Sequence, residues 1–138
     1  MKTVILVTRT LLGLSMLTLL VLGILFWTGR ALNLVGLHMT IGYVFVVLLW
    51  LMALLCWRAG APAGLAITTL IWGFVIAGLG MMQMRLMPGS LHWVIRTLHL
   101  LVGVAGMGMA GALSVRTRVT ARRPPSVTGQ TLHPQPGA

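Results

Sequence analysis

Four long apolar runs constrain the fold of this chain more than any other feature of its sequence. Each run reaches the roughly 20 residues that a helix needs to cross the apolar core of a bilayer. The mean hydropathy is +1.01 and only 7% of the residues are charged, whereas soluble domains approach about 25%. The sequence therefore predicts an all-α membrane protein with a four-helix transmembrane domain over residues 1–113. The predicted helices cover residues 4–27, 34–57, 63–84 and 91–113.

Short polar segments separate the four runs, at residues 28–30, 58–62 and 85–90. Glycine in all three segments, and proline in the last two, favour the end of one helix and the start of the next. Connections this short make consecutive helices antiparallel neighbours. We therefore expect an up-down four-helix transmembrane bundle.

The chain carries ten Lys and Arg residues and no Asp or Glu, which gives a formal net charge of +10. Without a carboxylate side chain it cannot build a paired-acid hydrolase site, a carboxylate cage for a metal, a Ser-His-Asp triad or a proton path through a membrane Asp or Glu. Cys56 is the single cysteine, so neither an intrachain disulfide nor a covalent Cys-x-x-Cys-His haem site can form.

The distribution of the basic residues predicts how the bundle lies in its membrane, because Lys and Arg are enriched on the cytoplasmic side. One side of the predicted bundle carries most of them, and the other carries Arg30 and Arg85. Both termini are therefore expected in the cytoplasm. Residues 114–138 lack apolar periodicity and are expected to form a disordered basic cytoplasmic tail. Contact with anionic membrane lipids accounts for its arginines, and no nucleic-acid partner is expected.

A repeated motif, Leu-His-x-x-x-Gly, carries the functional prediction. It places Gly42 four residues after His38, and Gly103 four residues after His99. A glycine four positions after a histidine lies on the same helix face, one turn along. Histidine can ligate a metal, and the glycine leaves room for a broad, flat group, so the two faces could clamp a haem between His38 and His99. A His38/His92 pair is the alternative, and the repeated glycine favours His99.

Arg96 lies between His92 and His99 on one stripe of the fourth predicted helix. An arginine inside a membrane helix is costly unless its charge reaches the interface or finds a partner. Because the chain has no carboxylate side chain, that partner must be lipid phosphate, water, a backbone carbonyl or a bound anion. A haem propionate held by Arg96 and His92 fits this requirement.

With these residues the chain resembles the small four-helix bacterial membrane b-type cytochromes. The resemblance rests on His38, Gly42, His99 and Gly103. It implies a multi-pass protein of the bacterial inner membrane that holds one non-covalent haem b in the outer half of its bundle. The expected activity is one-electron transfer from the quinol pool to a redox partner, by a carrier or an oxidoreductase subunit rather than a stand-alone enzyme.

Thr68, Thr69 and Gln83 are polar positions in the third predicted helix. They could contact a quinone head-group, whereas threonine hydroxyls are more often satisfied by the carbonyls of their own helix. A quinone bound at these positions is the additional ligand considered for the predicted cytochrome.

Two other functions stay open. One is a non-catalytic accessory or scaffold subunit of a membrane complex, or a homodimer, in which glycine-rich helix faces pack against partner helices. The other is a copper-binding or transport protein, because thioether sulfur suits Cu(I). The methionines would then be ligands rather than flexible side chains that fill an irregular helix end. They are Met81, Met82, Met84 and Met87.

Overall fold

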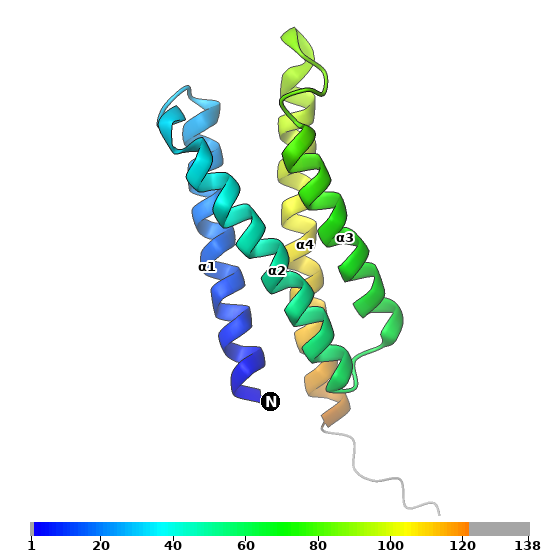
Figure 1. The fold of residues 1–138 in the computed structure, drawn as a ribbon. Helices are drawn as coiled ribbons and strands as arrows, with labels where there is room; N and C mark the ends of the chain where they lie inside the picture. The colour runs from blue at the N-terminus through cyan, green and yellow to red at the C-terminus, as the bar shows by residue number, and fades with distance from the viewer. Residues whose placement is uncertain (1, 122–138) are drawn as a thin grey trace, which may run out of the picture.

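The computed structural model describes residues 2–121 as four long helices joined by short turns (Figure 1). Within that range there is no β-strand, which confirms the predicted all-α class. Each helix is long and apolar enough to cross a membrane, and a helix satisfies its own backbone hydrogen bonds as a bilayer requires. The helices are α1 (Lys2–Trp27), α2 (Val35–Arg58), α3 (Ala63–Met82) and α4 (His92–Ala121), with one-turn 3-10 helices η1 (Leu32–Leu34) before α2 and η2 (Gly89–Leu91) before α4.

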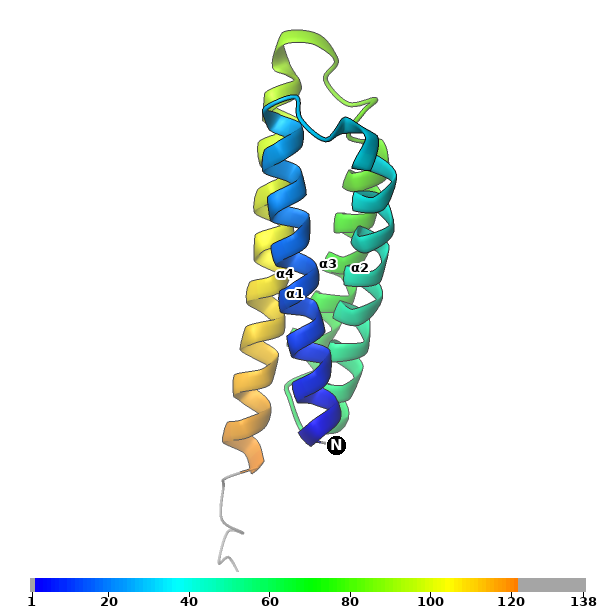
Figure 2. The ribbon, with the colours of Figure 1, turned by 90° about the vertical axis from the view of Figure 1, so that its left-hand side faces the viewer.

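Consecutive helices form two hairpins, α1 with α2 and α3 with α4, and the chain direction alternates from helix to helix (Figures 1 and 2). Between the hairpins, α2 contacts α3 and α1 contacts α4, and α2 also contacts α4 across the bundle. No Cα atoms of α1 and α3 lie within 8 Å of each other in the described residues. We call the end with the N-terminus and the α2–α3 turn the terminal end. The opposite end holds the other two connections, and we call it the two-loop end.

Two glycines end helices and reverse the chain. Gly29 has φ 72° and Gly60 has φ 92°, in the left-handed region that glycine enters without steric cost. The amides of Gly29 and Arg30 donate to carbonyls three and five residues back, at 3.0 and 2.8 Å. The amides of Gly60 and Ala61 make the same pair of bonds, at 3.0 and 2.9 Å. This Schellman arrangement satisfies the last carbonyls of α1 and α2 and explains why the connections can be so short.

The core lies in the half of the bundle nearer the terminal end. Buried side chains in α2 begin only at Phe45, and none of residues 35–44 is buried. In α3 they stop at Ile76, and none of residues 77–82 is buried. Figure 1 shows the same feature in the ribbon, because α2 and α3 converge toward the terminal end and diverge toward the two-loop end. The half at the two-loop end is therefore less closed.

Two tryptophans connect the helices inside the core. Trp50 Nε1 on α2 donates to a backbone carbonyl of α3 at 3.0 Å, and Trp72 Nε1 on α3 donates to a carbonyl of α4 at 2.9 Å. Each indole lies against a glycine of the helix to which it donates. Trp50 lies against Gly73 of α3, and Trp72 lies against Gly106 of α4. Interhelical hydrogen bonds in membranes contribute about 0.6 kcal/mol on average, so the close packing around the two glycines matters at least as much.

The fourth helix is longer than the sequence predicts. It ends at Ala121, whereas the apolar run ends at residue 113 and a disordered tail is expected from residue 114. Leu113 and Ser114 are buried, and the Ser114 hydroxyl donates to the carbonyl of Gly111 at 2.8 Å. No glycine or proline stands between Ser114 and Ala121 to end the helix. The tail prediction therefore does not hold for residues 114–121, and residues 122–138 lie outside the described part of the chain.

Candidate functional site

Two histidine rings lie in the less closed half of the bundle. His38 stands in the first turn of α2, and His99 stands about two turns into α4. The Nδ1 atoms of both rings are buried and have no hydrogen-bond partner. Among the described residues, no other half-buried or buried side chain has a buried nitrogen or oxygen atom without a partner. The helices that carry the two rings, α2 and α4, contact each other across the bundle. A buried polar atom without a partner costs about 1–3 kcal/mol and needs an explanation.

Packing rather than hydrogen bonding holds the two rings. Phe26 at the end of α1 meets the His38 ring edge-on, with ring centroids 5.4 Å apart and an interplanar angle of 66°. His99 lies against the backbone of α3, because a Cβ atom at Gly80 would stand 3.3 Å from its Cε1 atom. Neither ring is therefore committed to a hydrogen bond among the described residues, and each can present a nitrogen to a ligand.

The two glycines of the repeated motif have different surroundings. A Cβ atom at Gly42 would meet nothing within 4 Å, so the helix face one turn below His38 is open. A Cβ atom at Gly103 would lie 3.9 Å from Met16 Cε, so the thioether end of an α1 side chain covers that face. Methionine has three rotatable bonds and moves at low cost. The face beside His38 is open, and the face beside His99 is covered by a side chain that can move.

His92 and Arg96 lie nearer the two-loop end than His99. His92 Nδ1 lies 3.4 Å from the carbonyl oxygen of Leu86, so the ring contacts the connection between α3 and α4. Arg96 is exposed and makes no hydrogen bond or ion pair with any described residue. Its guanidinium is therefore available to a lipid phosphate or to a carboxylate brought by a ligand.

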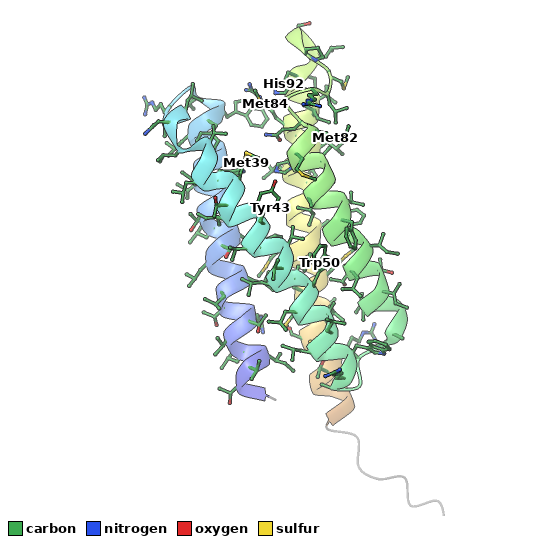
Figure 3. The ribbon with its side chains drawn as sticks, viewed as in Figure 1. Met39, Tyr43, Trp50, Met82, Met84 and His92 are labelled. Carbon is green, nitrogen blue, oxygen red and sulfur yellow. The ribbon has the colours of Figure 1, made fainter. Side chains whose placement is uncertain are left out.

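The four methionines singled out in the sequence are all exposed at the two-loop end. Their exposed fractions are 55% for Met81, 53% for Met82, 76% for Met84 and 42% for Met87. Figure 3 shows two further side chains, Met39 and Tyr43, on the side of α2 that faces the α3–α4 hairpin. Periodicity alone could not show which side of α2 they occupy, because every face of α2 is apolar.

The threonines of α3 are satisfied by their own helix. Thr68 Oγ1 donates to the Gly64 carbonyl at 2.9 Å, and Thr69 Oγ1 donates to the Leu65 carbonyl at 2.8 Å. Of the three polar positions considered for a quinone, Gln83 alone follows the end of α3 and lies at the two-loop end.

Two histidines are the ligands that this part of the bundle offers to a metal centre. Residues 2–121 hold no group of three or more His, Cys, Asp or Glu side chains that could bind a metal ion. A porphyrin itself supplies four nitrogen ligands to its iron, so two histidines on facing helices complete the coordination. Two unbonded histidines and an open glycine face fit this requirement. The missed neighbours, Phe26 and Gly80, gave no sequence signal, because their roles depend on which helices pack together.

Comparison with known proteins adds no relative to these observations. No protein-family model matches the chain, and neither a curated protein nor a solved structure matches it.

Proposed function

We propose that this protein is a membrane b-type cytochrome that holds one haem b between His38 and His99 and transfers single electrons. The observation that carries the proposal is the pair of half-buried histidine rings that make no hydrogen bond, on helices that contact each other. The Nδ1 atoms are enclosed by protein, so Nε2 is the nitrogen through which each ring would hold the iron. When bound, the haem supplies the one-electron chemistry.

The chain's own residues account for the rest of the proposed site. His38 and His99 would hold the haem iron, and Gly42 would leave room for the macrocycle, because a Cβ atom there meets nothing within 4 Å. Arg96 and His92, nearer the two-loop end, would hold the propionates. Phe26 and Gly80 limit how far the two imidazole rings can turn. The helices around the site are apolar, which lowers the local dielectric.

The direct test is the visible absorption spectrum of detergent-purified protein, after expression with ample haem. We expect a Soret band in the oxidised form and sharp α and β bands after reduction with dithionite. The absence of any band, with the protein folded, would overturn the proposal. The scaffold function would then remain, and co-purification would identify the partner.

We further propose that the protein lies in a bacterial inner membrane with its terminal end in the cytoplasm. Arg9, Arg58 and Arg116 lie at the terminal end, and the positive-inside rule favours the cytoplasm for it. A green fluorescent protein fused after Ala138 is expected to fluoresce, and alkaline phosphatase at that position to be inactive. Alkaline phosphatase inserted after Arg30 is expected to be active. Active phosphatase at Ala138 would reverse the orientation.

The face at Gly42 gives a further prediction about the proposed haem. The variant Gly42→Ala adds a methyl group where the structure has nothing within 4 Å, so the haem-free bundle should be unaffected. If a macrocycle lies there, the methyl group costs about 1–3 kcal/mol and weakens haem binding about 5- to 150-fold. Haem titration of the purified apoprotein measures the effect. Gly78→Ala, which also meets nothing within 4 Å, is the matched control. Equal haem affinity in both variants would remove Gly42 from the site.

A further inference from the structure

A second set of donor atoms lies at the two-loop end, and two of its three members, Met39 and Met84, have no part in the proposed haem site. Figure 3 shows Met39 on α2, and Met84 and His92 on the α3–α4 hairpin across from it. Met84 belongs to the connection after α3, and His92 is the first residue of α4. Three separate segments thus bring two thioethers and one imidazole to the same end of the bundle.

Exposure separates these methionines from the ones that fill the core. Met52 is fully buried, and Met16 and Met107 are partly buried against the core. Met84, in contrast, is 76% exposed and Met39 is 44% exposed. A methionine that fills a gap must contact the walls of that gap, so these two side chains do not serve as filling.

The ring of His92 is oriented in the way that metal-binding histidines commonly are. Its Nδ1 atom lies 3.4 Å from the carbonyl oxygen of Leu86. A carbonyl oxygen only accepts, so Nδ1 carries the proton in this contact, and the lone pair of the neutral ring is on Nε2. A backbone carbonyl that fixes the tautomer in this way is a usual outer partner of a histidine ligand.

The chemistry of these donors selects one kind of ion. Thioether and imidazole are soft or borderline ligands that suit Cu(I), whereas Mg²⁺, Ca²⁺ and Mn²⁺ prefer carboxylate and carbonyl oxygen. The chain has no Asp or Glu side chain to offer a hard divalent ion. A monovalent ion also adds the least charge to a protein with a formal net charge of +10.

We infer that Met39, Met84 and His92 form a Cu(I) site at the two-loop end. The site includes neither His38 nor His99, and it shares only His92 with the proposed haem site. The flexible methionine side chains close on the ion from the two hairpins. Binding therefore connects the hairpins at the end where α2 and α3 bury no side chain.

The test is a Cu(I) titration of the full-length protein in detergent under ascorbate, in competition with bicinchoninate. We expect one Cu(I) per chain, and the double variant Met39→Leu/Met84→Leu should bind at least about tenfold more weakly. The double variant Met16→Leu/Met107→Leu changes two methionines of the core region and should bind like the unmodified protein. His92→Ala should weaken binding as the first double variant does, and His133→Ala should not.

A second measurement identifies the ligands without relying on affinity. Ag(I) is a redox-inert substitute for Cu(I), and we expect it to shift the methyl carbon resonances of Met39 and Met84 in protein labelled at its methionine methyl groups. The resonances of Met16 and Met107 should stay in place. Absence of stoichiometric binding, equal weakening by both double variants, or shifts confined to the core methionines would each overturn the site. Because these readouts do not involve haem, their outcome is distinct from that of the proposed cytochrome function.

Discussion

Replacing His99 by alanine is expected to abolish the Soret, α and β bands of the purified protein, and replacing His38 is expected to do the same. Each histidine would supply one of the two protein bonds to the iron. The neighbours that touch the rings, Phe26 at His38 and Gly80 at His99, carry no donor atom to take its place. A loss of 1.4 kcal/mol already lowers affinity about tenfold, and a lost iron–nitrogen bond exceeds this. Haem occupancy should therefore fall below about a tenth of the unmodified level.

The control variants decide which histidines act as the pair. His133→Ala should leave the spectrum unchanged, and His92→Ala should keep the bands, because His92 is expected to contact a propionate rather than the iron. If His92→Ala removes the bands while His99→Ala retains them, the alternative His38/His92 pair is correct. If both variants keep the bands, the bis-histidine assignment is wrong.

Loss of folding would imitate loss of ligation, so the stability of the haem-free protein is measured as well. His99→Leu replaces a ring that has an unpartnered buried nitrogen with an apolar side chain. Such a replacement is nearly neutral or stabilising when no hydrogen bond is lost. We therefore expect His99→Leu to retain the helical circular dichroism and the unfolding midpoint of the haem-free protein while it loses haem binding. A lower midpoint would mean that His99 serves the packing of the bundle.

Gly73→Ala is expected to destabilise the bundle more than any other substitution of glycine by alanine in α3. The added methyl group would overlap the indole of Trp50 at Nε1 and Cδ1. That ring donates a hydrogen bond to the Leu70 carbonyl at 3.0 Å and packs on Phe74 with centroids 4.6 Å apart. Because the hydrogen bond and the contact with Phe74 both hold the indole ring in place, the ring cannot move aside without a loss of stabilising interactions. We expect a loss of about 1–3 kcal/mol in the free energy of unfolding.

Unfolding of the detergent-solubilised protein by sodium dodecyl sulfate measures this loss. Gly78→Ala, in the same helix, meets nothing within 4 Å and should be neutral or stabilising by up to about 1 kcal/mol. If the overlap with Trp50 is the cause, a smaller side chain at position 50 should relieve it, so Gly73→Ala should cost less when combined with Trp50→Leu than alone. Equal stability of Gly73→Ala and Gly78→Ala would contradict the explanation.

The number and positions of the helices follow directly from the sequence, because the length of an apolar run is set by the thickness of a bilayer. The ends of α1 and α2 follow from Gly29 and Gly60, whose positive φ angles few other residues adopt. The end of α4 does not follow from hydropathy. Leu113 and Ser114 are buried there, and burial sustains a helix beyond its apolar run.

At the candidate site, the features that follow from the sequence are even more clearly separate from those that depend on the tertiary structure. The sequence determined the ligand types: histidine and glycine one turn apart on two helices, and no carboxylate side chain. The tertiary structure alone decided that Gly80 lies against His99, that Met16 covers Gly103, and that the face at Gly42 is open. The physical reason is that period and composition fix which residues share one helix face, whereas the contacts of that face depend on how the helices pack. In a bundle whose helices are apolar on every side, the local pattern does not specify that packing.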